Sequence, residues 1–109
     1  MAAFMFTEEQ EMFRDTVRRL ADAQFRDGYL ERATSSEYPR AALAVLAKNG
    51  LLGLAVPEEF GGQAAEFVTM GIAIEELARA DFNVSYVTFN SILTGGLVSR
   101  LLPADERER

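Results

Sequence analysis

The chain has 109 residues, of which 49% are hydrophobic, so it is long and apolar enough for one domain with a modest core. Its net charge of −6, from 11 basic and 17 acidic residues, disfavours nonspecific binding to nucleic acid or to an anionic membrane. Because it contains neither histidine nor cysteine, disulfides, thiol chemistry, histidine-based triads and zinc sites built on these residues are excluded.

The start of the chain, from Met1 to Glu11, has no basic segment before a long apolar run, so a secretory signal and a membrane span are not predicted. A cytoplasmic protein is the expectation. Thr7 and Gln10 have the spacing of a capping box, which predicts a helix beginning there. Its apolar stripe is expected to consist of Phe13, Val17, Leu20, Ala21 and Phe25.

Small and polar side chains then interrupt the helical pattern, and residues 31–37 are predicted to form a loop. A second helix is predicted to have Pro39 at its first position and to stop at Asn49-Gly50, since proline suits a helix start and glycine a helix end. We expect its inner face to consist of Leu43, Leu46 and Ala47.

After a connector spanning residues 51–62, a third helix is predicted from about Ala65 to Ala80, and a fourth from Asp81 or Asn83 to just before Pro103. The stripe of the third helix is expected to comprise Phe67, Met70, Gly71, Ile74, Leu77 and Ala78, widened by Val68 and Ile72. The fourth is apolar around much of its circumference, which predicts burial by more than three neighbours. The residues concerned are Val84, Val87, Ile92, Leu93, Leu97, Val98, Leu101 and Leu102.

Residues 103–107 have the composition of another opening helical turn, with proline first and acidic residues behind it. We therefore expect the chain to be a piece of a longer protein. The pattern as a whole predicts an all-α fold, an up-and-down helical bundle of about four to five helices.

Two pairs of adjacent carboxylates, Glu58-Glu59 and Glu75-Glu76, could serve acid–base or metal chemistry. Neighbours on a helix point about 100° apart, however, so Glu75 and Glu76 do not easily share one ligand. Arg79 follows them at helix salt-bridge spacing. The pairs are therefore predicted to be solvated or to form structural ion pairs, and no catalytic or metal-binding residue is predicted.

The two glycine pairs lack the spacing of a phosphate-binding loop. Gly61-Gly62 is predicted to turn the chain after Phe60. Gly95-Gly96 lies inside a helical segment, and two interpretations stay open there: close packing, or space for a ligand or a neighbouring domain.

Residues 83–93 mix small polar side chains with aromatic ones inside a segment that otherwise predicts burial. One interpretation is that the serine and asparagine bond to the local backbone while the aromatics fill the core. The other is a pocket wall, apolar with a few polar points. The pattern alone favours the first.

Several segments occur here in a characteristic order: TEEQEMFRDTVRRLADAQF, YPRAALAVLAKNGLLGLAVPEEFGG, IAIEELARAD, and a glycine-containing helix that leads to LPADER. Taken together, they make residues 1–109 resemble the N-terminal helical domain of the acyl-CoA dehydrogenase family.

The resemblance implies an enzyme that oxidises the Cα–Cβ bond of an acyl-CoA, with FAD accepting the hydride and an electron-transfer flavoprotein as the usual electron partner. It implies a β-domain and a C-terminal helical bundle, absent from these residues, that carry the glutamate base and nearly all FAD and CoA contacts. The chain alone is then expected to bind no FAD and to be inactive. The whole protein is expected to form a homo-oligomer and to have no nucleic-acid or membrane partner. By position, the floor of the acyl-chain pocket would be formed by Ser85, Tyr86, Phe89, Asn90 and Leu93.

Other interpretations remain at this point. The chain could be a stand-alone, non-catalytic module for interaction or assembly, or half of an enzyme that a second polypeptide completes. Relatives that run a different flavin reaction, namely acyl-CoA oxidases, nitroalkane oxidases and flavin monooxygenases, have the same fold. The acyl length, its branching and the electron acceptor stay undetermined.

Overall fold

The computed structural model describes residues 5–102 and 104–107, and regular structure in them is helical. The helices are α1 (Glu8–Gln24), α2 (Tyr29–Thr34), α3 (Arg40–Lys48), the short 3₁₀ helix η2 (Glu58–Phe60), α4 (Phe67–Ala80), α5 (Phe82–Leu101) and α6 (Ala104–Arg107). The all-α prediction is confirmed. The helical turn predicted for residues 103–107 is present as α6, while Pro103 itself lies outside the described residues.

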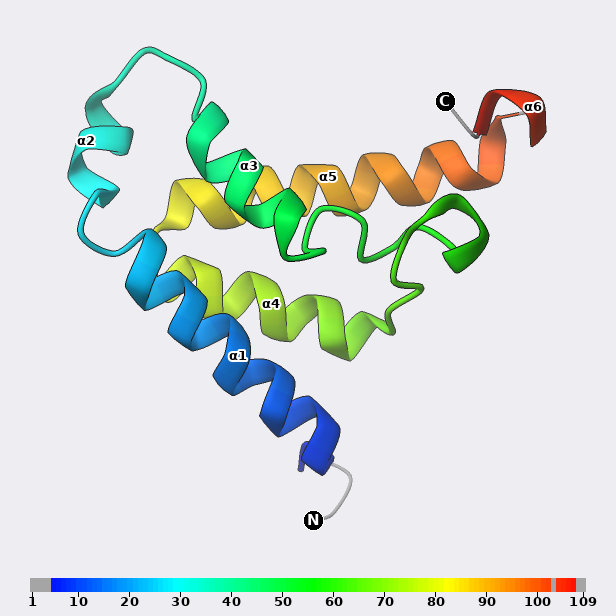
Figure 1. The fold of residues 1–109 in the computed structure, drawn as a ribbon, viewed down its shortest axis with the longest axis horizontal. Coiled ribbons are helices and arrows are strands. Elements are labelled where there is room, and N and C mark those ends of the chain that lie inside the picture. The colour runs from blue at the N-terminus through cyan, green and yellow to red at the C-terminus, as the bar shows by residue number, and fades with distance from the viewer. Residues whose placement is uncertain (1–4, 103, 108–109) are drawn as a thin grey trace.

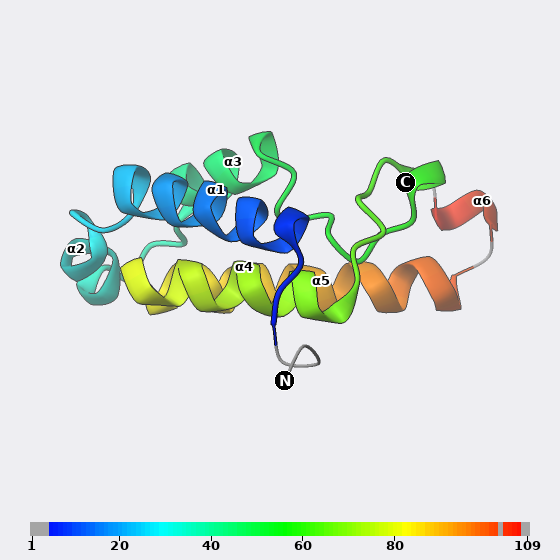
Figure 2. The same cartoon turned by 90° about the horizontal axis from the view of Figure 1, so that it is seen from below.

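The helices form two layers (Figure 1, Figure 2). α4 and α5 are antiparallel neighbours in one layer, and α1 and α3 lie over them in the other, α1 against α4 and α3 against α5. α2 sits at the end where α5 begins. The described part of the chain is a slab of 43 × 41 × 19 Å, and no described element covers the second face of the α4–α5 layer.

α1 begins as predicted. The side chain of Thr7 accepts a hydrogen bond from the backbone N–H of Gln10, and the Gln10 side chain accepts one from the N–H of Thr7. This capping box satisfies two backbone donors that the first turn would otherwise leave without partners. The predicted stripe faces the core, where Val17, Ala21 and Phe25 are buried.

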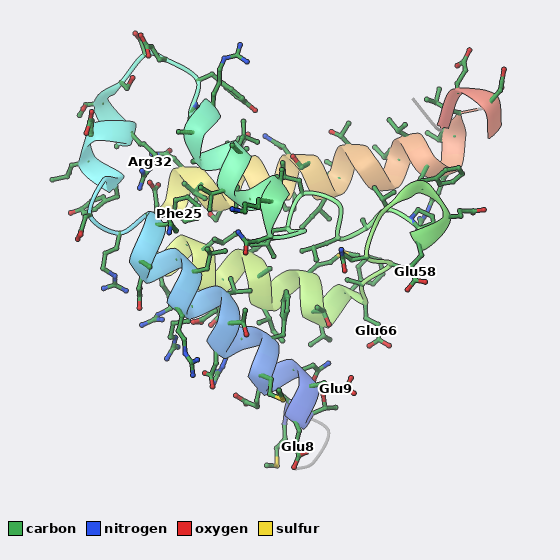
Figure 3. The ribbon with its side chains drawn as sticks, viewed as in Figure 1. Glu8, Glu9, Phe25, Arg32, Glu58 and Glu66 are labelled. Atoms are coloured by element: carbon green, nitrogen blue, oxygen red, sulfur yellow. The ribbon has the colours of Figure 1, made fainter. Side chains whose placement is uncertain are left out.

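α2 corrects the predicted loop at residues 31–37, because the chain stays helical up to Thr34. Arg32 anchors this helix to the rest of the domain. Its guanidinium donates hydrogen bonds to the buried carboxylate of Asp81 and to the carbonyl of Phe25, and lies over the Phe25 ring (Figure 3). Asp81 is 49 residues away in sequence, so no local pattern of side chains could have revealed this contact.

The inner face of α3 agrees with the prediction at Leu46 and differs from it at the other two positions. Ala42 and Leu46 are buried, whereas Leu43 is only half-buried and Ala47 is exposed. Pro39 is the residue that caps the helix and not its first member. α3 packs against α5, and Ala42 and Leu46 are the residues of α3 that belong to the buried core.

The two buried carboxylates, Glu76 and Asp81, are paired. Glu76 on α4, with 2% of its surface exposed, accepts hydrogen bonds from Arg18 on α1 at 2.8 Å and from Arg79 at 3.1 Å. The structural ion pair predicted from the spacing to Arg79 is thus confirmed for Glu76. Asp81, also buried, accepts from the backbone N–H groups of Asn83 and Val84 and so caps α5 at the predicted place.

α4 begins at Phe67, two residues later than predicted, and its buried side differs from the predicted stripe. The buried residues are Ile72, Ala73, Glu76, Leu77 and Ala80. Phe67 is exposed, and Met70 and Ile74 are only half-buried. Leu77 and Ile72 are thus buried as predicted, whereas Phe67, Met70 and Ile74 form a second apolar side of α4 that is only partly covered.

α5 is not surrounded as predicted. The exposed large apolar side chains along it are Phe82, Tyr86, Phe89, Leu93, Leu97, Val98 and Leu101. Most of them recur at helical spacing along the face that the described elements leave open. Among the described helices, none combines the length and the apolarity needed to cross a bilayer.

Candidate functional site

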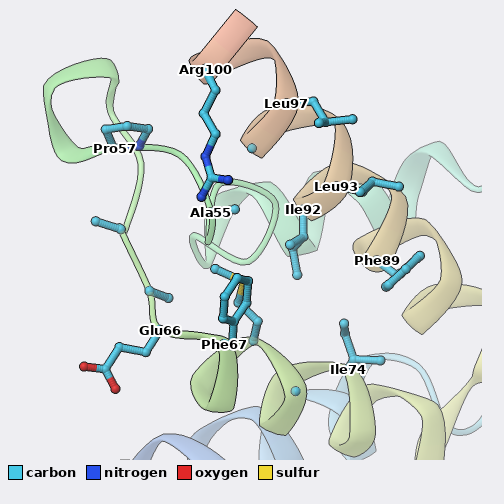
Figure 4. Close-up of a pocket in the computed structure, with 15 residues that line it drawn as sticks. Ala55, Pro57, Glu66, Phe67, Ile74, Phe89, Ile92, Leu93, Leu97 and Arg100 are labelled. Atoms are coloured by element: carbon cyan, nitrogen blue, oxygen red, sulfur yellow. The ribbon is translucent and has the colours of Figure 1, made fainter.

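An apolar groove lies between α4, α5 and the connector that joins α3 to α4 (Figure 4). Its volume is about 650 Å³, in the range of small-molecule sites in proteins. Its wall is formed by Ala55, Pro57, Ala64, Ala65, Glu66, Phe67, Met70, Gly71, Ile74, Phe89, Ile92, Leu93, Gly96, Leu97 and Arg100.

Two side walls of the groove are formed by apolar residues that recur at helical spacing along α5 and α4. From α5, Phe89, Leu93 and Leu97 recur every four residues and line one side, with 47%, 51% and 49% of their surfaces exposed. From α4, the stripe that includes Phe67 and Ile74 lines the other side. In Figure 4, Phe67 rises from α4 toward Ala55 of the connector. The half-exposed apolar surface on both helices is therefore concentrated in one place.

The connector closes the third side of the groove and is held by its own backbone. The N–H groups of Gln63, Ala64 and Ala65 donate to the carbonyls of Gly53, Val56 and Leu54, at 2.7 to 3.0 Å. Ala64 adopts a φ of +48°, an uncommon conformation for alanine that these hydrogen bonds accompany.

The two glycine pairs allow the connector to pack closely on itself and on α5. A side chain at Gly62 would meet the Val56 carbonyl oxygen at 2.1 Å, so only glycine fits there. A Cβ at Gly95 would lie 2.9 Å from a Val56 methyl group, and one at Gly96 would lie 3.5 Å from Ala55. Gly95 therefore lets the connector approach α5 closely, which favours the close-packing interpretation, while Gly96 also lines the groove.

Glu66 and Arg100 are the charged side chains among the described residues that line the groove. Glu66 directly precedes α4 and Arg100 lies in the last turn of α5. Because α4 and α5 are antiparallel, both are at the connector end. Figure 4 shows the Glu66 carboxylate directed away from the groove and the Arg100 side chain directed along its edge toward Ala55.

The five residues predicted as the pocket floor do not all lie in one place in the structure. Phe89 and Leu93 line the groove together. Ser85 is buried on the other side of α5, where its hydroxyl donates to the Phe82 carbonyl at 2.6 Å, as the local-backbone interpretation predicted. Tyr86 and Asn90 are exposed and lie outside the groove wall.

Sequence reasoning did not assign the α4 and connector residues to the site. The signal was present in the apolar stripe of α4, which is wider than one buried face requires, but it was interpreted as core. Arg100 carried no signal, since a cation in the last turn of a helix is common for electrostatic reasons alone.

The connector does not offer a glycine-rich phosphate-binding loop. A flavin dinucleotide needs donors for its pyrophosphate, usually backbone N–H groups of a glycine-rich loop. In the connector these donors are already used: Gly61 donates to Glu58 and Gly62 to Pro57. Metal ligation receives no support either, because residues 5–102 and 104–107 contain no group of three carboxylates placed to hold an ion.

The sequence of this chain is similar to those of known proteins, and the matches point to one family. The sequence model of the family described as "Acyl-CoA dehydrogenase, N-terminal domain" matches residues 7–105. A probable acyl-CoA dehydrogenase of Mycobacterium leprae, fadE25, is 37% identical over 98 residues, which are 89% of this chain and 25% of that protein. The probable acyl-CoA dehydrogenase YdiO of Escherichia coli K12 is 39% identical over 77 residues, covering 70% of this chain and 20% of the relative.

A more distant relative, the acyl-CoA dehydrogenase fadE12 of Mycobacterium tuberculosis, is 25% identical over 107 residues, 98% of this chain and 28% of its own length. The chain thus spans about a quarter of the length of the curated relatives it matches. Because the family model matches residues 7–105 and the described structure is all-α, the chain belongs to the acyl-CoA dehydrogenase family and corresponds to the family's N-terminal domain.

Proposed function

We propose that residues 1–109 form the N-terminal helical domain of an FAD-dependent acyl-CoA dehydrogenase and that their groove supplies part of the wall of the acyl-chain site. The observation that carries this proposal is the groove itself, which joins apolar side chains from α4 and α5 in one open depression. Of the predicted floor residues, Phe89 and Leu93 take this role. Ser85 lies on the buried side of α5, where it bonds to the backbone of its own helix.

The wall would act on the substrate through desolvation. An alkyl chain lying along Phe89, Leu93 and Ile74 exchanges contact with water for contact with apolar side chains, at about 25 cal/mol per Å² buried. Such binding holds the reacting end of a substrate in place without taking part in the chemistry. α,β-Dehydrogenation of the acyl-CoA would require groups outside this chain, so the chain alone is proposed to be inactive and to bind no FAD.

The remaining parts of the proposal follow from the family. The relatives are about four times as long as this chain, and a β-domain and a C-terminal bundle would cover the exposed apolar face of α5. FAD would be held by those parts, electrons would leave to an electron-transfer flavoprotein, and the assembly would be a cytoplasmic homo-oligomer.

A chimera tests the enzymatic assignment. This chain replaces the matching segment of the Mycobacterium leprae relative, and dehydrogenation of acyl-CoAs of graded length is assayed with an artificial electron acceptor. An active flavoprotein is expected, and Phe89→Ala should shift its preference toward longer or bulkier acyl groups. Tyr86→Ala, a change outside the groove, is the matched control. If the chimera is folded and carries flavin but Phe89→Ala leaves its acyl-length preference unchanged, the groove is not part of the acyl-chain site.

A second candidate, a stand-alone interaction module without enzymatic activity, is favoured by the exposed face of α5. Flavin content and sedimentation of the purified 109-residue chain separate the two. A colourless, self-associating sample that becomes an active flavoprotein only in the chimera supports the domain assignment. A stable, flavin-free monomer that fails to complete the chimera would support the module.

A further inference from the structure

α2 is attached to the domain without burying any of its six residues. Its two large apolar side chains face solvent, Tyr29 with 48% and Leu30 with 63% of their surfaces exposed. A helix usually docks on a core because it buries an apolar face there. Since α2 buries none, another interaction keeps it in place.

Arg32 supplies this interaction. Among the described residues, the side-chain hydrogen bonds that leave α2 all come from Arg32, because Thr34 bonds only within its own helix. The Arg32 guanidinium donates to the carboxylate of Asp81, which caps α5, and to the carbonyl of Phe25, which ends α1 (Figure 3). Both partners are buried. One side chain of α2 therefore joins the end of one core helix to the start of another.

Gly28, the residue before α2, leaves the space that the guanidinium occupies. A Cβ at this position would lie 2.7 Å from Nη1 of Arg32 and 3.3 Å from its Cζ. The φ of Gly28 is −98°, which other residues also adopt, so the backbone conformation does not require a glycine. An alanine at this position would displace the guanidinium from the two acceptors that hold it.

We propose that α2 is a strap, fastened by Arg32, that opens as one unit while α1, α4 and α5 stay folded. When the guanidinium leaves, α2 is far shorter than the about 12–15 residues that a helix needs to persist alone in water. Asp81 keeps the hydrogen bonds from the N–H groups of Asn83 and Val84, so α5 retains its cap. Opening therefore uncovers the junction of α1 and α5 at Phe25 and Asp81 without unfolding the core. The strap does not depend on the proposed acyl-CoA function.

Native-state hydrogen exchange of the 109-residue protein, resolved by residue at increasing urea below the unfolding transition, tests the strap. The N–H groups of Arg32 and Ser35, which donate to carbonyls of residues 28 and 31, report on α2, and that of Leu77 reports on α4. Exchange in α2 should be at least about tenfold faster than in α4. It should also be nearly independent of urea, because local opening exposes little surface, whereas exchange in α4 should rise with urea.

Two variants release the strap in different ways. Gly28→Ala should speed exchange of the α2 amides about tenfold or more by displacing the guanidinium, although alanine is otherwise the better helix residue. Gly71→Ala is the matched control, because a Cβ there meets no heavy atom within 4 Å. Arg32→Gln should also speed exchange in α2, whereas Arg26→Gln, which breaks an exposed pair with Asp22, should not.

Two results would overturn the proposal. One is exchange of the α2 and α4 amides of the wild type at the same rate and with the same urea dependence, because α2 would then leave only when the whole domain unfolds. The other is unchanged exchange in α2 of folded Arg32→Gln, because another contact would then hold the helix. Circular dichroism checks that each variant is folded, and the wild-type comparison decides the matter if Arg32→Gln is not.

Discussion

The two ends of the α4–α5 pair differ in whether their side chains are covered and paired with other residues. At the end where α4 turns into α5, the buried carboxylates of Glu76 and Asp81 are paired with arginines from α1 and α2. At the connector end, the same two helices separate around an apolar groove, and Phe67 at its mouth is 82% exposed. We infer that the first end carries the stability of the domain and the second is kept available for binding.

The largest expected effect is at the closed end. Arg32→Met would leave the buried Asp81 carboxylate without its guanidinium, which should lower the free energy of unfolding by about 3–5 kcal/mol. Urea unfolding followed by circular dichroism measures this. The control is Arg26→Met, whose partner Asp22 lies in an exposed pair and whose loss should cost at most about 0.5 kcal/mol. Equal costs for the two variants would contradict the comparison between the ends.

A pH effect should follow from Glu76. Burial acts to raise the pKa of its carboxyl, but the hydrogen bonds and charges of Arg18 and Arg79 outweigh it and lower the pKa below the ordinary value of 4.5. A lowered pKa in the folded state means stabilisation that is present above pH 4.5 and lost as the pH falls through the folded-state pKa.

The stability difference between wild type and Glu76→Gln should therefore shrink between pH 7 and pH 3. Urea unfolding at a series of pH values measures it, with Glu75→Gln, at the exposed neighbouring position, as the control. A difference that stays constant or grows toward acid would mean that the ion pairs do not hold Glu76 ionised.

The smallest effect on stability is expected at the open end. Phe89→Ser should change the free energy of unfolding by less than about 0.5 kcal/mol, because the side chain is already half exposed. It should nevertheless reduce self-association in sedimentation, since it removes apolar surface from the uncovered face. Leu77→Ala, on the buried side of α4, should cost about 2–5 kcal/mol. A large stability loss for Phe89→Ser would show that the groove end is part of the core.

These contrasts also explain what the sequence could reveal. The start of α1 was predictable because its signals, Thr7 and Gln10, are three residues apart and act on each other. α2 was not, because the Arg32 contacts that hold it depend on Asp81, which is distant in sequence. Local signals identify elements whose stabilising contacts are local, and they miss those held by tertiary contacts.

For a related reason, the sequence anticipated only some of the residues that line the groove. The residues from Phe67 to Ile74 were recognised as apolar, but periodicity cannot distinguish a side chain covered by another helix from one that lines an open groove. Phe89 and Leu93 were assigned through their position in the family resemblance, and the structure places both in the groove. Ser85 shares their helix yet lies on the opposite side, so position along the chain alone was not sufficient.

The connector has a consequence for how this domain tolerates changes in length. Irregular surface segments usually accept insertions and deletions, because few of their backbone groups are committed to partners. Here the carbonyls of Gly53, Val56 and Leu54 accept hydrogen bonds from the N–H groups of Gln63, Ala64 and Ala65, and Gly95 fits against Val56. One added residue would displace some of these donors from their acceptors, so we expect this irregular segment to tolerate changes in length poorly.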